Sequence, residues 1–129
     1  MTVELFSLVA TAALLLVLAL ISGVLYGKQI GNAALGGNRE NLPAATGVAG
    51  RAQRAHRNLI ENALPFAIVV LIAQVMQIST FVTQAAALVF LAARLLHAVV
   101  YIAGITRIRT PIWFAGVAAN IALAVPLLL

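Results

Sequence analysis

Long apolar stretches alternate with short polar segments along this chain. Four stretches are almost wholly apolar, at residues 3–26, 62–78, 81–103 and 111–129. A helix needs about 20 apolar residues, each rising about 1.5 Å, to cross about 30 Å of hydrocarbon. Each stretch approaches that length, so the pattern predicts an all-α protein, an integral membrane bundle of four spanning helices.

The polar segment after the first stretch is expected to contain a loop and then the start of the second helix. Residues 27–49 are rich in glycine and include Pro43, which predicts a surface loop of about 20 residues. From Gly50 onwards, good helix formers lead without a break into the second apolar stretch. Pro65 is expected to kink this second helix. The predicted spans in a single domain of residues 1–129 are therefore about 3–26, 50–78, 81–103 and 111–129.

Composition supports a membrane location. Hydrophobic residues make up 64% of the 129 residues and charged residues 9%, and the mean hydropathy is +1.09. A soluble domain of this size does not need so many apolar residues to fill one core. The first stretch lacks a basic leader and is longer than the core of a signal peptide, so we expect a retained anchor. The absence of cysteine excludes disulfides, thiolate metal sites and a cysteine nucleophile.

The basic residues predict the orientation of the chain. They gather in or beside the first and third connections: Lys28, Arg39, Arg51, Arg54, Arg57, Arg107 and Arg109. By the positive-inside rule these loops are cytoplasmic, whereas both termini and the turn at 77–80 face the other side. The short loops and alanine-rich spans favour a bacterial inner membrane. The net charge of +5 then reflects topology and contact with anionic membrane lipids, and no nucleic-acid-binding motif accompanies it.

The densest polar run, RAQRAHRNLIEN at residues 51–62, is expected to line a binding site. At about 100° per helical residue, four of its side chains share one face, which we term the polar stripe: Arg51, Arg54, Asn58 and Glu61. Arg57 lies at the edge of this face, and His56 points nearly opposite. Guanidinium groups bind carboxylates, asparagine donates and accepts, and glutamate accepts from an ammonium group. The polar stripe therefore matches a small zwitterion with several carboxylates.

The third span carries a second polar face, made of Arg94, His97 and Tyr101. A charge near the middle of a bilayer costs about 2.5–3.5 kcal/mol on insertion scales, so Arg94 and Glu61 are expected to face the protein interior or a wet cavity, where they could pair. Structural explanations stay open, because His97 could bond between packed helices and Tyr101 could belong to an interfacial aromatic belt. The arginine cluster could likewise mark topology alone. No metal site is predicted, since His56 and His97 lack a third ligand.

Two motifs resemble the MAPEG family, the membrane-associated proteins in eicosanoid and glutathione metabolism. They are the run at 51–62 followed by Pro65-Phe66, and ARLLHAVVY at 93–101 with Arg107 and Arg109 after it. The resemblance spans the whole chain, including its length, its four spans, its long first connection and its short second turn. It implies homotrimers of four-helix subunits that hold glutathione at the cytoplasmic side, between adjacent subunits.

The resemblance also implies roles for individual residues. The residues implied to bind glutathione are Arg51, Arg54, Arg57, Asn58, Glu61, His97 and Tyr101. Within this set Glu61 suits the amino group of glutathione and Arg54 suits a carboxylate. In catalytic members an arginine near the start of the fourth helix stabilises the glutathione thiolate, and here Arg109 is the first candidate and Arg107 the second.

The implied activity is that of a glutathione-dependent transferase or peroxidase. Its substrate would be a lipophilic electrophile or hydroperoxide that enters from the bilayer, and glutathione would be the co-substrate. A cation near the sulfur favours the thiolate, which is the nucleophile. The implied partners are further copies of the chain, membrane lipids and this lipophilic small molecule.

Three other functions stay open. Some members of the family bind lipid without catalysis, so a non-catalytic lipid-binding or scaffold role is the main alternative. A small multidrug exporter needs a membrane-embedded carboxylate in its first helix, where this chain has only Glu4 at the very end. The third is a structural membrane protein without a ligand.

Trp113, beside Arg109, is interpreted as an interface anchor.

Overall fold

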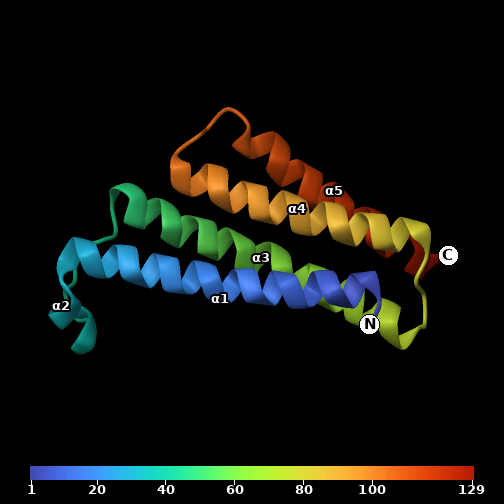
Figure 1. The fold of residues 1–129 in the computed structure, drawn as a ribbon, viewed down its shortest axis with the longest axis horizontal. Helices are drawn as coiled ribbons and strands as arrows, with labels where there is room; N and C mark the ends of the chain where they lie inside the picture. The colour runs from blue at the N-terminus through green and yellow to red at the C-terminus, as the bar shows by residue number, and fades with distance from the viewer.

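The structure, a computed structural model, describes all 129 residues and contains helices but no strand. In chain order the helices are α1 (Val3–Ile30), α2 (Asn32–Gly36), α3 (Gly47–Val75), α4 (Phe81–Ala103) and α5 (Arg109–Leu128) (Figure 1). All except the short α2 are long and apolar enough to cross a membrane. The all-α fold with four membrane-spanning helices is therefore confirmed.

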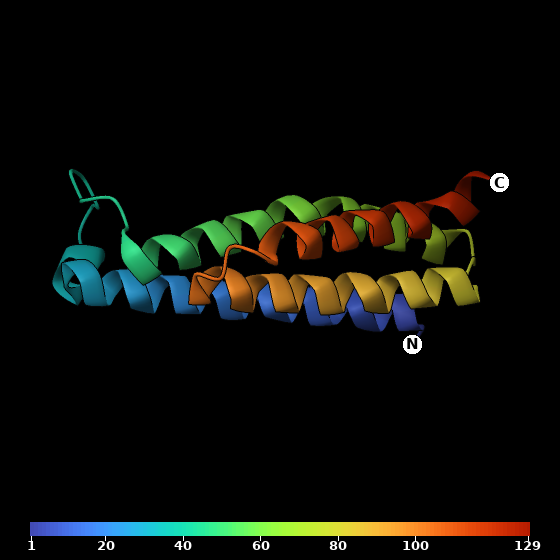
Figure 2. The ribbon, with the colours of Figure 1, turned by 90° about the horizontal axis from the view of Figure 1, so that it is seen from above.

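The four long helices run up and down a bundle. α1 packs mainly against α3, and α4 packs mainly against α5. Figure 2 shows α1 and α4 in one layer and α3 and α5 in the other, so that α1 and α5 lie diagonally across the bundle. Both termini and the α3–α4 turn lie at one end of the bundle, whereas α2 and the α4–α5 connection lie toward the other (Figure 1).

The first connection is more helical than expected. α1 continues past residue 27, α2 follows, and α3 begins before residue 50, so the loop predicted at 27–49 is wrong at both ends. Gly31, at φ +90°, separates α1 from α2. Gln29 then ties the returning chain to α1, because it donates to the Ala44 carbonyl and accepts from the Thr46 N–H, both at 3.0 Å. Glycine content alone does not reveal such contacts between distant residues.

The other helix ends lie close to the predicted spans. α3 stops at Val75 and not at residue 78, where Gln77 adopts a positive φ of 56° in the turn toward α4. α4 begins with a capping box in which Thr80 and Thr83 each accept from the other's backbone N–H. Pro65 lies inside α3 and does not end it.

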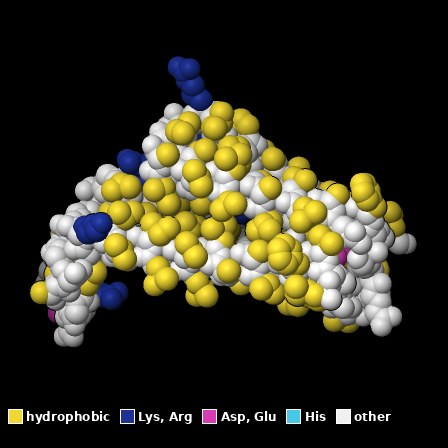
Figure 3. Space-filling view, in the orientation of Figure 1, with side chains coloured by type: hydrophobic (Ala, Val, Ile, Leu, Met, Phe, Trp, Pro, Cys, Tyr) yellow, Lys and Arg dark blue, Asp and Glu magenta, His cyan; other side chains and the backbone are white.

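The core is narrow and rich in small residues. Phe66 of α3 stacks on Phe90 of α4, with ring centroids 3.9 Å apart, in a cluster that also buries Leu123 of α5. A smaller cluster surrounds Leu59 of α3 and Leu18 of α1. Buried alanines supply most of the remaining contacts, which lets the helix backbones approach closely, as in membrane bundles. Many large apolar side chains lie instead on the outside, where lipid would cover them (Figure 3).

A polar cluster fastens α1 to α4 at the end that carries the termini. Glu4 is 3% exposed, and its carboxylate accepts hydrogen bonds from the hydroxyls of Ser79 and Thr83. Gln84 in turn donates to the Ser79 hydroxyl at 3.1 Å. The buried carboxylate of α1 is thus satisfied by hydroxyl donors at the start of α4.

Candidate functional site

A cavity of about 310 Å³, which we term the site cavity, opens between α3, α4 and the start of α5. Its lining residues are Asn58, His97, Tyr101, Arg109, Thr110, Trp113 and Phe114. Asn58 comes from α3, His97 and Tyr101 come from α4, and α5 supplies the rest. The site cavity therefore combines polar groups with aromatic rings where three helices meet.

A guanidinium stacks on an aromatic face inside the site cavity. His97 and Tyr101 lie one turn apart on α4, and their ring centroids are 5.5 Å apart at 65°, an edge-to-face contact. The Arg109 Cζ lies 4.5 Å from the centroid of the Tyr101 ring, within cation–π distance. Arg109 is only partly exposed, so its charge is held at the wall of the site cavity.

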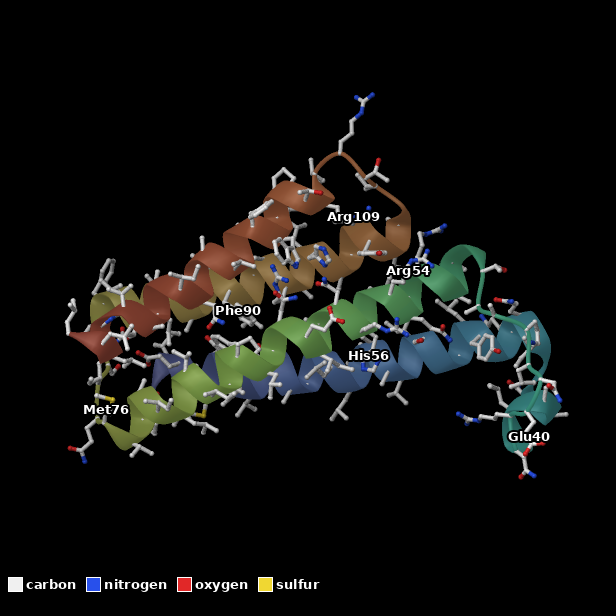
Figure 4. The ribbon with its side chains drawn as sticks, turned by 180° about the vertical axis from the view of Figure 1, so that it is seen from behind. Glu40, Arg54, His56, Met76, Phe90 and Arg109 are labelled. Atoms are coloured by element: carbon white, nitrogen blue, oxygen red, sulfur yellow. The ribbon has the colours of Figure 1, made fainter.

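The two arginines near the start of α5 occupy different environments. Arg109 is the first residue of α5 and lines the site cavity. Arg107 lies in the preceding connection, is exposed and is not part of the lining. Figure 4 shows Arg109 beside the α4–α5 connection. Of the two candidates, Arg109 is therefore the one beside His97 and Tyr101.

Arg51 contacts the end of α4 and does not line the site cavity. Its Nε donates to the Ile102 carbonyl at 2.8 Å. The guanidinium also lies against Gly104, where α4 ends in a left-handed conformation at φ +80°. A Cβ on Gly104 would come within 3.4 Å of the Arg51 Nε. Arg51 thus binds a free carbonyl at the C-terminus of α4, where a positive charge is also favourable.

Two residues of the polar stripe, Arg54 and Glu61, turn away from the core of the chain, as does Arg57 at its edge. Arg54, Arg57 and Glu61 are exposed, and Figure 4 shows Arg54 and His56 on opposite sides of α3. Glu61 follows the buried Leu59 by two residues, which places it on the opposite side of the helix. Glu61 is expected to face a protein interior or a wet cavity, and within the single chain it lies on the exposed side of α3, because buried residues such as Leu59 decide which face packs inward.

The family model for the MAPEG family matches residues 5–129, almost the whole chain. The chain belongs to the MAPEG family. No curated protein matches the sequence of the chain. Membership places this MAPEG chain, at a coarse level, in a membrane family of glutathione-related transferases and peroxidases.

The site cavity and the charged residues beside it offer several kinds of polar group to a ligand. The site cavity offers a guanidinium, an imidazole, a phenol and an amide, and its volume of about 310 Å³ lies at the small end of ligand pockets. Arg54 and Glu61 lie about one turn before and one turn after Asn58, so they extend the polar lining onto the exposed face of α3. A cation and an anion flanking an amide suit a ligand that has both carboxylates and an ammonium group.

Arg94 of the MAPEG chain lies beside the site cavity but pairs with no carboxylate. It is 1% exposed, and its Nη2 donates to the Trp113 carbonyl at 2.8 Å. Its Nε and Nη1 are buried without a hydrogen-bond partner. The pairing that Arg94 and Glu61 could make is not formed within the chain, because Arg94 reaches α5 while Glu61 lies on the exposed face of α3.

Three lining residues were not expected as site residues: Thr110, Trp113 and Phe114. Trp113 was interpreted only as an interface anchor. One signal in the sequence could have found them, because Trp113 lies one helical turn after Arg109 and the other two are neighbours of these residues. The pairing of α5 with α4, which brings that turn to His97 and Tyr101, is visible only in the structure.

Proposed function

We propose that this protein is a membrane-bound glutathione-dependent transferase or peroxidase that acts on a lipophilic electrophile or hydroperoxide. The observation that carries the proposal is the site cavity, which brings Asn58, His97, Tyr101 and Arg109 together from three helices. Membership of the MAPEG family supports glutathione as the co-substrate. The surrounding apolar surface supports a substrate that arrives through the bilayer.

The polar stripe and its neighbours bind the ends of glutathione in this proposal. Arg54 and Arg57 are exposed guanidiniums that can bind carboxylates, and Glu61 can accept from the ammonium group. Asn58 is suited to a peptide group of the ligand, since it both donates and accepts. Arg51 already uses its Nε on the Ile102 carbonyl, so only its terminal nitrogens are left for a carboxylate.

The site is completed by a neighbouring subunit in a homotrimer. The side chains of Arg54, Arg57 and Glu61 make no hydrogen bond within the chain and lie on the exposed face of a spanning helix. Charged side chains at such a position are expected to face protein or water and not lipid. A second copy packed beside α3 would give them protein surroundings and would enclose glutathione between subunits.

Arg109 supplies the catalytic charge. Its guanidinium is held over the Tyr101 ring at the wall of the site cavity, so a thiol bound there would have a lowered pKa and would ionise to thiolate. When bound, glutathione supplies the sulfur that either attacks an electrophilic carbon or is oxidised as a hydroperoxide is reduced to an alcohol. Trp113 and Phe114 form an apolar wall against which the lipophilic substrate can pack.

The orientation of the chain follows from its charges in the same proposal. The exposed Lys and Arg side chains visible in Figure 3 lie toward α2 and the α4–α5 connection. We therefore assign these loops to the cytoplasm of a bacterial inner membrane, by the positive-inside rule. Both termini and the Glu4 cluster then lie on the opposite side. The site cavity faces the cytoplasmic pool of glutathione.

Calorimetry with glutathione on detergent-purified protein tests the proposal. Saturable binding is expected for the wild type and is expected to weaken about tenfold or more in Arg54→Ala and in Glu61→Ala, since each change removes a charge-assisted hydrogen bond. Glu40→Ala is a matched control, because Glu40 is an exposed acid in the first connection, far along the chain from the site. Absence of binding at millimolar glutathione would exclude the enzymatic function.

A non-catalytic lipid-binding role in the same family is the second candidate. A groove of about 430 Å³ between α4 and α5 favours it, because every lining residue there is apolar. Phe81, Val89 and Ala118 are among them. If glutathione does not bind, mass spectrometry can identify lipid that co-purifies with the protein. Lipid retained by this groove would support the second candidate.

A further inference from the structure

Arg94 is a buried cation that packing alone does not explain. It is 1% exposed in the middle of α4, and two of its three guanidinium nitrogens have no hydrogen-bond partner. Its Cζ lies 5.6 Å from the Phe90 ring centroid, which compensates the charge only in part. An apolar side chain of similar size would pack here without unpaired N–H groups. A buried ionisable group in a membrane helix therefore points to a role in function.

Gly116 of α5 makes room for the Arg94 side chain. A Cβ at this position would overlap the guanidinium group, so any larger residue would displace it. Gly116 is buried and lies in the interior of α5. Glycine in a helix interior is destabilising relative to alanine, and here it lets an arginine from α4 lie directly against the backbone of α5.

The hydrogen bond from Arg94 reaches the turn of α5 that follows Arg109. The Arg94 Nη2 donates to the Trp113 carbonyl, one turn after Arg109. The N-cap of α5, Ile108, makes no side-chain hydrogen bond to the helix. The connection before it, residues 104–108, is exposed throughout. The contact with Arg94 is therefore well placed to fix the first turns of α5 against α4.

We propose that Arg94 is a positioning residue, which holds the Trp113 carbonyl and thereby sets the place of the Arg109 guanidinium over the Tyr101 ring. Its effect on catalysis rests on the proposed function, whereas its effect on α5 does not. Because a misplacement of about 1 Å matters for a charge that must stabilise a thiolate, the loss of this contact is expected to change the chemical step more than glutathione affinity.

The first test measures α5 directly. Trp113 is the only tryptophan in the chain, so its fluorescence reports on the turn that Arg94 holds. In Arg94→Met, acrylamide quenching of Trp113 is expected to rise about twofold and its anisotropy to fall, as a local contact is lost. Gly116→Ala keeps the arginine but displaces it, so it should give the same result and serves if Arg94→Met does not fold. Unchanged quenching and anisotropy in both variants would overturn the proposal.

The matched control separates this effect from general loss of stability. Leu123→Ala removes a fully buried side chain of α5 that lies two turns or more beyond Trp113, in the core cluster around Phe66 and Phe90. It is expected to lower the unfolding temperature while leaving Trp113 quenching unchanged. Equal changes in Trp113 quenching in Leu123→Ala and Arg94→Met would contradict a specific role for Arg94.

The second test uses glutathione and splits binding from chemistry. Arg94→Met is expected to keep the dissociation constant within about threefold of the wild type but to lower kcat and the thiolate absorbance about tenfold. Arg94→Lys keeps both a donor and the charge and should restore most of the thiolate signal. A wild-type thiolate signal in Arg94→Met would overturn the catalytic part. If the wild type binds no glutathione, the proposed function fails, and the fluorescence test still decides whether Arg94 holds α5.

Discussion

At the scale of single residues, the environment of Arg109 decides what its charge can do. The guanidinium is held by the face of Tyr101 and not by a carboxylate. A carboxylate partner would neutralise the charge, whereas a cation–π contact fixes its position and leaves most of its field available. Arg109 can therefore both stay in place and attract an anion bound in the site cavity.

Replacing Arg109 and, separately, Arg107 tests which of the two arginines acts in catalysis. Arg109→Ala is expected to lower kcat about 10²-fold, as for the loss of one preorganised donor, with a smaller change in KM. Arg107→Ala should stay within about twofold of the wild type, because Arg107 is exposed outside the site cavity. Steady-state conjugation of glutathione to a lipophilic electrophile measures both. If Arg107→Ala lowered kcat more than Arg109→Ala does, Arg107 and not Arg109 would be the catalytic arginine.

Gly104 carries a separate prediction, on stability. It ends α4 at φ +80°, a left-handed conformation that a residue with a Cβ rarely adopts. Gly104→Ala is therefore expected to destabilise the protein by about 1 kcal/mol or more, seen as a lower unfolding temperature in detergent. Gly36→Ala is the control, because Gly36 has ordinary φ and open space around its Cα. An equal loss of stability in both variants would show that the left-handed conformation is not the cause.

At the scale of the elements, the two ends of the bundle are held by different chemistry. Around the Glu4 cluster, hydroxyl groups satisfy a buried carboxylate and tie α1 to α4. Around the site cavity, arginine side chains bind backbone carbonyls: Arg51 holds Ile102 and Arg94 holds Trp113. The first end can therefore be changed without touching the groups that are proposed to bind glutathione.

Thr83→Val tests that separation. Valine fills the space of threonine but removes the hydroxyl that donates to Glu4, which leaves a buried carboxylate with fewer donors. The change is expected to lower the free energy of unfolding by about 1–3 kcal/mol. Glutathione affinity should be unchanged, because the site cavity lies between α3, α4 and the start of α5. A tenfold loss of affinity would show that the two ends of the bundle are coupled.

The elements themselves show what the sequence could and could not predict. Runs of apolar residues predicted the four long helices, because crossing a bilayer sets a minimum length. The first connection was predicted poorly, since its course depends on Gln29 bonding to residues 15 and 17 positions later. Helical periodicity grouped the polar stripe correctly on one side of α3. It could not show that Arg54 and Glu61 are exposed while Asn58 lines the site cavity, which depends on how the alanine-rich face packs.

The residues of the site could likewise be predicted from local sequence motifs, but their contacts with distant residues could not. Asn58, His97, Tyr101 and Arg109 were predicted from motifs, and the structure places all of them at one cavity. Trp113 and Phe114 were missed as lining residues because their place depends on how α5 lies against α4. Whether Arg94 pairs with Glu61 could not be decided from the sequence for the same reason: a helix position shows which residues share a face, but not which neighbour that face meets.

At the scale of the whole molecule, a single chain leaves charged groups exposed on a helix that is long enough to span the membrane. Arg54 and Glu61 are exposed on α3, a helix long enough to span the membrane. Lipid would leave these charges poorly solvated, and a second copy of the chain would not. The polar stripe also extends from Asn58, which already lines the site cavity. Subunit contact and glutathione binding should therefore depend on each other.

Native mass spectrometry from mild detergent measures that dependence. The wild type is expected to appear as a homotrimer with one glutathione per chain at saturation. Adding glutathione should shift the balance toward the trimer, because a ligand that binds only the assembled form stabilises it by mass action. Glu61→Ala should weaken this shift, since it removes the group suited to the ammonium of glutathione. Monomers that bind glutathione with the affinity of the trimer would contradict a site shared between subunits, and would place the whole binding site within the one chain.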